Sequence, residues 1–211
     1  GRISKLDETH FTVVNKPEYW GASGGLEYEA AWALGSDTGV DDLEALTYVN
    51  FLCNEEGMDP ISFGATVAAA MELYEMGVLT EKETGGLALK FGSAAALTKI
   101  AEMTANGEGF GKIIGLGSKR LCEKYGHPEL SMAVKGQEFP AYDPRGVVGM
   151  GVAYATCNRG ACHIRAWTPA VEILGDMDPK TPEGKAAWVI ASQHETTWLD
   201  ATGVCLFITS G

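Results

Sequence analysis

Residues 41–77 read DDLEALTYVNFLCNEEGMDPISFGATVAAAMELYEMG, and this stretch decides the fold because it predicts two consecutive helices. Asp42 precedes an apolar-periodic run, as the N-cap of a helix does, and Gly57 marks the end of that first helix. Asp59 introduces a second helix, rich in alanine, over residues 61–76. The stretch therefore predicts a helical core.

Further helical patterns lie on both sides of this pair. Thr80 and Glu83 have the spacing of a capping box for a short additional helix. Residues 126–160 are rich in Pro and Gly, which predicts loops, and residues 200–205 are expected to follow the last helix as a loop. Apolar periodicity and good helix formers predict the other helices over residues 27–34, 93–106, 110–125 and 183–199.

We therefore expect a mainly α protein of two helical subdomains with long Gly/Pro-rich loops. Residues 1–128 form the first subdomain, which opens with a short loop or strand segment, and residues 129–211 form part of the second. A chain of 211 residues that is 45% hydrophobic can bury such a core. The opening Gly1-Arg2 carries no readable secretion signal, and we expect it to continue from a longer protein.

Charge, the length of the apolar runs and cysteine content argue against three classes of protein: nucleic-acid-binding, membrane-associated and disulfide-stabilised proteins. The net charge of -12 argues against nucleic-acid binding, which requires a basic surface. The apolar runs are far shorter than the roughly 20 residues that span a bilayer, so we expect no membrane association. The five cysteines are odd in number, widely spread and contain no C-x-x-C pair, which argues against a disulfide scaffold and favours a reducing cytoplasm.

Two segments carry residues suited to acid-base or anion chemistry. Residues 27–29, EYE, place two carboxylates around a phenol, and a dry pocket would raise the pKa of such a carboxyl enough to make it a general base. The alternative is a solvated helix N-terminus. Residues 140–146, PAYDPRG, can aim Tyr142 or Arg145 at an anion from a rigid loop, and here the alternative is a structural ion pair.

Two further segments combine polar side chains with glycine. In residues 159–165, RGACHIR, His163 stands between two arginines, whose charge favours a neutral imidazole that can accept a proton; the alternative is a buried, satisfied histidine. Residues 200–205, DATGVC, have a relative in residues 54–59, NEEGMD, where glycine permits a bend that brings amides to a ligand. Each alone is a weak glycine turn, and the alternative for Cys205 is a small buried hydrophobe.

Taken together, these segments resemble the tungsten-containing aldehyde ferredoxin oxidoreductase family. In that family two mainly helical domains close over a bis-pterin tungsten site, whose base is a separate N-terminal domain. This chain resembles much of the two helical domains. The resemblance runs along the whole chain, in the order of the family, through the segments GLEYEAAWALG, DDLEA, CNEEGMDPISFG, MELYEMG, GHPELSMAVKG, PAYDPRG, GVAYATCNRGACHI and DATGVCLF.

The resemblance implies that Glu29 is the active-site glutamate, His163 the active-site histidine and Tyr142 a phenol of the pocket. Glu29 would activate water or the hydrated aldehyde, and His163 or Tyr142 would polarise the carbonyl oxygen. The implied reaction of anaerobic metabolism converts an aldehyde and water to a carboxylic acid. Two electrons would pass through tungsten and an iron-sulfur cluster to ferredoxin or another electron-carrier subunit.

The implied cofactors are a tungsten bis-molybdopterin and a 4Fe-4S cluster, with Mg²⁺ bridging the pterin phosphates. Two D-x-x-G-L-D/C motifs contact the pterins in the family, and Asn54 here replaces the first Asp, keeping an acceptor oxygen without a negative charge. Cys205 corresponds to the fourth cluster cysteine, and the other three would precede Gly1. The implied pterin contacts are Asn54, Met58, Asp59, Arg165, Asp200 and Val204.

Two alternatives to aldehyde oxidation remain at this point. The first is the tungsten subunit of a benzoyl-CoA reductase-type enzyme, which carries a cysteine near its pocket, whereas no cysteine lies near Glu29 in the sequence. The second is a non-catalytic scaffold fragment, which predicts the loss of Glu29, His163 and Cys205. In some members of the family, a metal bridges two subunits through a Glu-x-x-His pair. Residues 47–51, TYVNF, lack this pair, so we expect no dimer of that kind and leave another kind of oligomer open.

Overall fold

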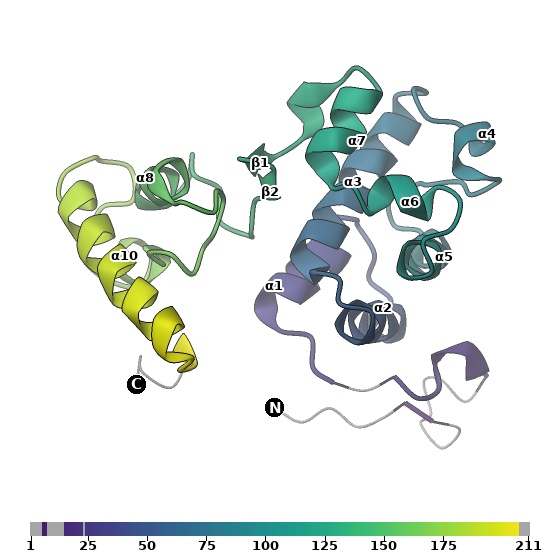
Figure 1. The fold of residues 1–211 in the computed structure, drawn as a ribbon, viewed down its shortest axis with the longest axis horizontal. Helices are drawn as coiled ribbons and strands as arrows, with labels where there is room; N and C mark the ends of the chain where they lie inside the picture. Colours follow the sequence, from purple (N-terminus) through teal and green to yellow (C-terminus); the bar gives the residue numbers. More distant parts are fainter. Residues whose placement is uncertain (1–5, 8–14, 23, 207–211) are drawn as a thin grey trace. The chain divides into compact units, whose positions relative to one another are not determined.

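The computed structural model describes residues 6–7, 15–22 and 24–206. In these ranges the chain is mainly helical, which confirms the predicted fold class. The helices gather into two compact units, Gly1–Met132 and Ala133–Gly211 (Figure 1). No helix within the described ranges is long and apolar enough to cross a membrane.

Helices α2 (Leu43–Glu55) and α3 (Pro60–Glu75) lie at the centre of the first unit, where the sequence predicts two helices. The Asp42 carboxylate accepts a hydrogen bond from a first-turn N–H at 3.0 Å, so it caps α2. Asp59 caps α3 in the same way, with an N–H to oxygen distance of 3.2 Å. Both predicted helix starts are confirmed.

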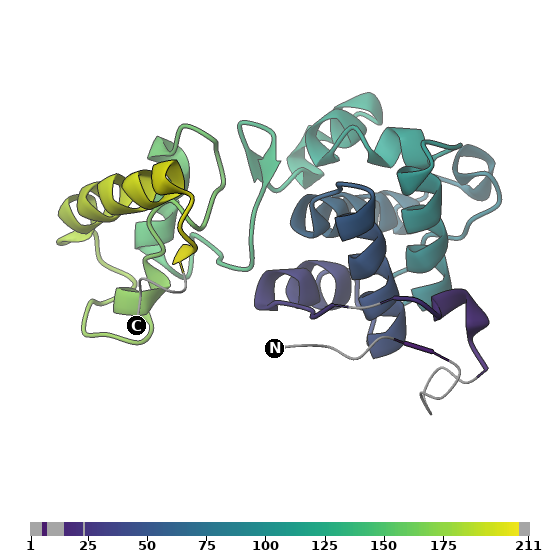
Figure 2. The same ribbon diagram turned by 60° about the horizontal axis from the view of Figure 1, so that its bottom comes forward.

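The remaining helices of the first unit surround this pair. Helix α5 packs along α2, and α7 packs on α3 (Figures 1 and 2). Thr80 and Glu83 form the predicted capping box at the start of α4. The bounds are Pro17–Tyr19 for η1, Tyr28–Ala31 for α1, Trp32–Ser36 for η2, Glu81–Thr84 for α4, Ala94–Ala105 for α5, Gly111–Ile114 for α6, Ser118–Lys124 for α7 and Pro128–Leu130 for η3.

The core of the first unit is apolar and is shared by α2, α3, α5 and α7. Burial of one large aliphatic side chain stabilises the fold by about 1.5–3 kcal/mol relative to its exposure. Packing between the helices therefore outweighs the propensity of any single helix. Fully buried members of this core include Val49, Met71, Leu97, Ile100 and Leu121.

The second unit combines a small hairpin with three helices. Strands β1 (Ala133–Val134) and β2 (Gln137–Glu138) pair antiparallel, and Lys135 at φ 56° with Gly136 at φ 80° makes the turn between them. The helices are α8 (Val148–Thr156), α9 (Pro169–Glu172) and α10 (Lys185–Thr202).

The loop predicted over residues 126–160 is wrong for residues 148–156, which form α8. Gly149 lies inside this helix, where a Cβ would come within 2.6 Å of Glu172 Oε2. The absence of a side chain lets Glu172 Oε1 accept a hydrogen bond from the Gly149 N–H at 2.9 Å. Glycine at this position therefore serves close packing between α8 and α9 and not a turn.

A buried ion pair joins α9 to α10. Lys185 Nζ lies 2.5 Å from Glu172 Oε1, and the two side chains are 1% and 0% exposed. Lys185 also donates to the Asp178 carbonyl oxygen. Together with the Gly149 N–H, these bonds tie α8, α9 and α10 around one carboxylate.

The loop predicted over residues 200–205 is wrong at its beginning, because α10 continues through Thr202. Gly203, with φ 72°, ends the helix in the left-handed conformation that glycine adopts readily. Asp200 therefore projects from the last turn of a helix and not from a loop.

Candidate functional site

Glu29 lies in α1, and its side chain is buried within the first unit, with 5% exposed. The neighbouring Glu27 is exposed and Tyr28 is 62% exposed, so the polar residues of this segment do not share one environment. The interpretation of Glu29 as a solvated residue at a helix N-terminus is therefore wrong. A buried carboxylate is the kind of group that acts as a general base.

Behind α1 the chain leaves the α conformation and forms the π-helix η2. The Trp32 carbonyl oxygen accepts the N–H of the residue five positions later at 2.9 Å. The buried Thr38 hydroxyl donates to the Leu34 carbonyl oxygen at 2.5 Å. The helix predicted over residues 27–34 is thus confirmed, although it changes from α to π at Trp32, and π-turns of this kind are frequent at functional sites.

In the second unit, the side chains of Tyr142 and His163 lie close to each other. Their ring centroids lie 6.0 Å apart, and Trp167 meets Tyr142 edge-on at 6.2 Å. The buried Tyr154 of α8 donates from its hydroxyl to the Tyr142 carbonyl oxygen at 3.0 Å, which fixes the loop that carries Tyr142. Sequence reasoning missed Trp167, because no local pattern distinguishes it from a core tryptophan.

Asp143 and Arg145 pair with each other. Arg145 Nη2 lies 2.6 Å from Asp143 Oδ2, and the two side chains are 83% and 51% exposed. Hydrogen bonds from the Arg145 side chain and backbone lower the pKa of Asp143 to about 2. The alternative of a structural ion pair is therefore confirmed for these two residues, and the Arg145 guanidinium is engaged by its neighbour.

Asp200 forms ion pairs with the two arginines that flank His163 in the sequence. Its Oδ2 atom lies 2.7 Å from Arg165 Nη2 and 3.4 Å from Arg159 Nη2. Arg165 is the less exposed of the two, and its Nη1 is buried with no hydrogen-bond partner among the residues that the structure describes. A buried, unsatisfied donor of this kind is suited to an acceptor group of a ligand.

Residues 54–59 run from the last turn of α2 to the residue before α3. The Asn54 side-chain amide donates to the Asn50 carbonyl oxygen at 2.7 Å, so its own oxygen is the atom that can accept from a ligand. Asp59 accepts from the Ser62 hydroxyl at 3.0 Å in addition to capping α3. Met58 is partly buried against the core of the first unit.

Residues 54–59 and 200–205 share one backbone arrangement. Asn54 and Asp200 each lie in the last turn of a long helix. Three residues later, Gly57 at φ 69° and Gly203 at φ 72° turn the chain away in the left-handed conformation. The similarity between the two segments in sequence therefore corresponds to a similarity in structure.

Cys205 differs from the other cysteines of the chain. It is exposed, which contradicts its interpretation as a small buried hydrophobe, whereas the remaining four are buried. Burial raises the pKa of the Cys53 thiol to about 12, which makes that thiol inert. Within residues 6–7, 15–22 and 24–206, no group of three or more His, Cys, Asp or Glu side chains could hold a metal.

The predicted site residues are divided between the two compact units. The first unit carries Glu29, Asn54, Met58 and Asp59. The second carries Tyr142, His163, Arg165, Asp200, Val204 and Cys205, of which Val204 is 40% exposed.

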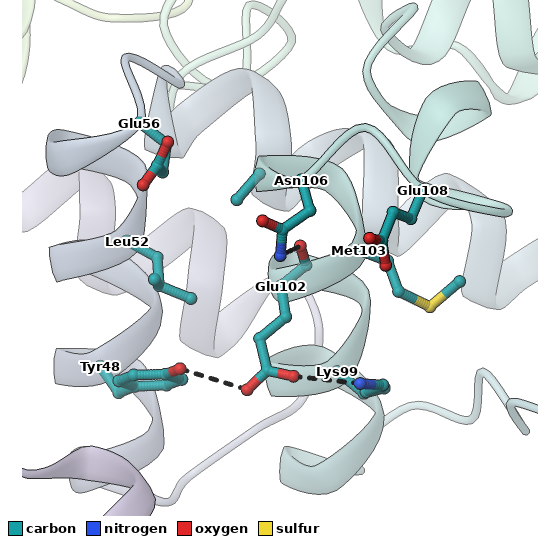
Figure 3. Close-up of a pocket in the computed structure, with 9 residues that line it drawn as sticks. Tyr48, Leu52, Glu56, Lys99, Glu102, Met103, Asn106 and Glu108 are labelled. Atoms are coloured by element: carbon teal, nitrogen blue, oxygen red, sulfur yellow. Dashed lines mark hydrogen bonds and ion pairs between the residues drawn. The ribbon is translucent and has the colours of Figure 1, made fainter.

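A cavity of about 310 Å³ lies between α2 and α5 and contains none of the predicted site residues (Figure 3). Glu102 of α5 accepts from the Tyr48 hydroxyl of α2 at 3.1 Å and from Lys99 Nζ of its own helix at 3.2 Å. Burial, together with the charge of Glu102, raises the pKa of Tyr48 to about 12. This network closes one end of the cavity with polar side chains.

Comparison with known proteins gives consistent matches along the chain. Residues 5–211 match the family described as aldehyde ferredoxin oxidoreductase, domains 2 and 3. The tungsten-containing aldehyde ferredoxin oxidoreductase of Pyrococcus furiosus is 46% identical over 203 residues, which are 94% of this chain and 34% of that protein. The protein of the same description from Thermococcus kodakarensis is 45% identical over 203 residues, with the same coverage of 94% and 34%.

A more distant relative is named for a different activity. The aliphatic sulfonate oxidoreductase, WOR-like subunit, of Pyrococcus furiosus is 29% identical over 164 residues, which are 74% of this chain and 26% of that protein. The chain spans about a third of the length of the first two relatives, 34% in each case.

Proposed function

Because this chain belongs to the aldehyde ferredoxin oxidoreductase family, we propose that it forms the helical part of a tungsten enzyme that oxidises aldehydes to carboxylic acids. The observation that carries the proposal is the identity of 46% over 94% of the chain to a tungsten-containing aldehyde ferredoxin oxidoreductase. A base domain of the same protein completes the enzyme, since the chain covers 34% of that relative.

The polar atoms of the second unit fit a pterin cofactor. Buried Arg165 Nη1, which has no hydrogen-bond partner in the described ranges, supplies a donor for a pterin acceptor. Asp200, in the same cluster, accepts from a pterin ring N–H, with Val204 and the Gly203 turn beside it. When bound, the tungsten-pterin group supplies the redox centre for two-electron oxidation of the substrate.

In the first unit, the turn after α2 serves the second pterin. Asn54 offers its side-chain oxygen as an acceptor, and Met58 and Asp59 follow the left-handed Gly57. Mg²⁺ between the pterin phosphates would complete the cofactor. The absence of a negative charge on Asn54 makes this contact weaker than the contact of Asp200.

The acid-base chemistry falls to three side chains. Glu29, buried on α1, would accept a proton either from the water that attacks the aldehyde carbonyl or from a hydroxyl of the hydrated aldehyde. His163 or Tyr142, which pack against each other, donates a hydrogen bond to the carbonyl oxygen as negative charge develops there. Each of these side chains lies in a segment that the fold fixes through buried contacts.

Cys205 supplies one thiolate of a 4Fe-4S cluster, and three further cysteines come from another part of the protein. Its exposure supports this role, because a cluster ligand has to be reachable from outside its own helical unit. Ferredoxin or another electron-carrier subunit then accepts the electrons. The cysteines form no disulfide in the described part of the chain, which supports a reducing cytoplasm as the location.

The proposal is tested on the full-length enzyme with the variant Glu29→Gln and the matched control Glu27→Gln. Tungsten and iron contents should match the wild type in both variants. Aldehyde oxidation should fall by about 10²–10⁴-fold in Glu29→Gln, because general acid-base catalysis contributes that much, and should be unchanged in the exposed control. Equal turnover in the two variants would remove Glu29 from the mechanism, and an enzyme without tungsten and iron would refute the proposed function.

A further inference from the structure

Gly64 lies in the second turn of α3, at a point where two backbones meet. A Cβ built on Gly64 would come within 2.4 Å of the Ala33 carbonyl oxygen, 2.5 Å of its carbonyl carbon and 2.9 Å of its Cβ. These contacts are too close for any L side chain and involve main chain, which cannot swing away. Glycine is a poor helix former, so its place inside a long helix calls for a packing reason, and the Ala33 backbone supplies one.

The segment that rests on Gly64 is the π-helix η2. Ala33 belongs to η2 and is 0% exposed, so it is enclosed by other parts of the chain. The Thr38 hydroxyl, also 0% exposed, donates to the Leu34 carbonyl oxygen of η2 at 2.5 Å. This hydrogen bond also stabilises the π-turn. The turn is therefore held between α3 and its own hydrogen bonds.

Glu29 precedes Ala33 by four residues, which is about one helical turn. Helix α1 runs directly into η2, and α3 contacts both elements. A displacement of Ala33 away from α3 is therefore passed along a short rigid path to the Glu29 side chain, which is itself buried.

We propose that Gly64 is a positioning residue that sets how closely the α1–η2 segment lies on α3 and thereby holds the Glu29 carboxylate in place. This inference rests on the proposed role of Glu29 in proton transfer. A displacement of about 1 Å in a reacting group can cost about 10²-fold in rate. The contact between Gly64 and Ala33 thus matters for turnover as well as for packing.

The test uses the full-length enzyme with Gly64→Ala and the matched control Gly115→Ala. Gly115 ends helix α6 with φ in the α region, and its nearest heavy atom to an added Cβ lies at 3.5 Å, so it accepts the same methyl group without strain. We expect Gly64→Ala to lower kcat about 10²-fold at unchanged tungsten content. The control should keep wild-type turnover.

A double variant separates positioning from general damage. In a Glu29→Gln background, Gly64→Ala should cause little further loss, because groups that act as one unit are not additive. Hydrogen exchange measured by mass spectrometry should quicken in peptides over residues 28–40 of Gly64→Ala and stay unchanged in the control. Multiplicative losses in the double variant, or exchange equal to that of the control, would overturn the inference.

A second variant covers the case in which Gly64→Ala does not fold. Thr38→Val keeps the shape of the side chain and removes the hydroxyl that closes η2, so it should slow turnover in the same non-additive way. If the losses of turnover from Thr38→Val and Glu29→Gln multiply in the double variant, the inference is also overturned. If Glu29→Gln alone leaves turnover unchanged, the proposed function of Glu29 fails, whereas the exchange data still decide whether Gly64 holds the turn.

Discussion

The buried pair of Glu172 and Lys185 allows a sharp prediction about stability. Lys185→Met would leave Glu172 buried with a charge and one remaining hydrogen bond, from the Gly149 N–H. Its Oε2 atom already lacks a hydrogen-bond partner within the described ranges, so nothing else there offsets the charge. Removal of one partner from a buried pair typically costs about 3–5 kcal/mol. Because both side chains are almost fully buried, we expect a loss in that range.

Urea unfolding followed by circular dichroism measures this loss. With a urea m-value of about 1–3 kcal/mol/M, the midpoint for the second unit should fall by roughly 2 M. Lys180→Met is the matched control, because the Lys180 side chain is exposed and donates to the Arg145 carbonyl oxygen at 3.3 Å. Its midpoint should hardly move.

A second substitution identifies the cause of the loss. Glu172→Gln in the Lys185→Met background removes the buried charge while keeping an oxygen for the Gly149 N–H, so it should recover much of the stability. A loss below about 1 kcal/mol in Lys185→Met would refute the reasoning. A double variant no more stable than the single one would refute it as well.

The remaining stability predictions concern the first unit. Burial raises the pKa of Asp37 to about 6, so the folded protein holds a proton on this carboxyl more tightly than the unfolded chain does. The contribution of this group to the stability of the fold is complete below about pH 4 and is lost as the pH rises through 6. Asp37→Asn should therefore raise the free energy of unfolding by about 1–2 kcal/mol at pH 7, after allowance for its partial exposure, and change little at pH 4, as urea titrations at the two pH values would show. An equal effect at both pH values would exclude titration as the cause. Tyr48→Phe removes the hydrogen bond to Glu102 at 3.1 Å and should cost about 1 kcal/mol in thermal or urea unfolding, whereas no loss would mean that water replaces the hydroxyl.

The helix starts could be predicted because their signals are local. Asp42 and Asp59 cap α2 and α3 through N–H groups only two or three residues away. The capping box of Thr80 and Glu83 is equally short in range. In each case the residue type and the spacing that define the interaction are both visible in the sequence.

Features that depend on distant residues could not be predicted in this way. Gly149 reads as a loop residue until Glu172, which lies 23 positions later, shows why a helix needs glycine there. The change from α to π at Trp32 has no local sequence signal, and the Ala33 backbone in this π-helix lies against Gly64 of α3. Tertiary packing overrides local propensity at these positions.

The candidate site was predictable to a similar extent. Tyr142 and His163 lie close together, although their positions in the sequence do not show it, and burial separates Glu29 from Glu27, which the sequence does not distinguish. The gathering of Arg159 and Arg165 on Asp200 had no sequence signal, since Asp200 lies 41 residues from Arg159.

The matching turns after α2 and α10 differ in the charge of the side chain that each helix carries in its last turn. The last turn of a helix carries partial negative charge from its free carbonyl groups, and an acidic side chain there is unfavourable by about 0.3–1 kcal/mol. Asn54 avoids this repulsion because it has no charge, whereas Asp200 keeps its charge and recruits two guanidinium groups from outside its own helix. The two turns are thus alike in shape but differ in charge, because Asn54 is neutral whereas Asp200 is paired with Arg159 and Arg165.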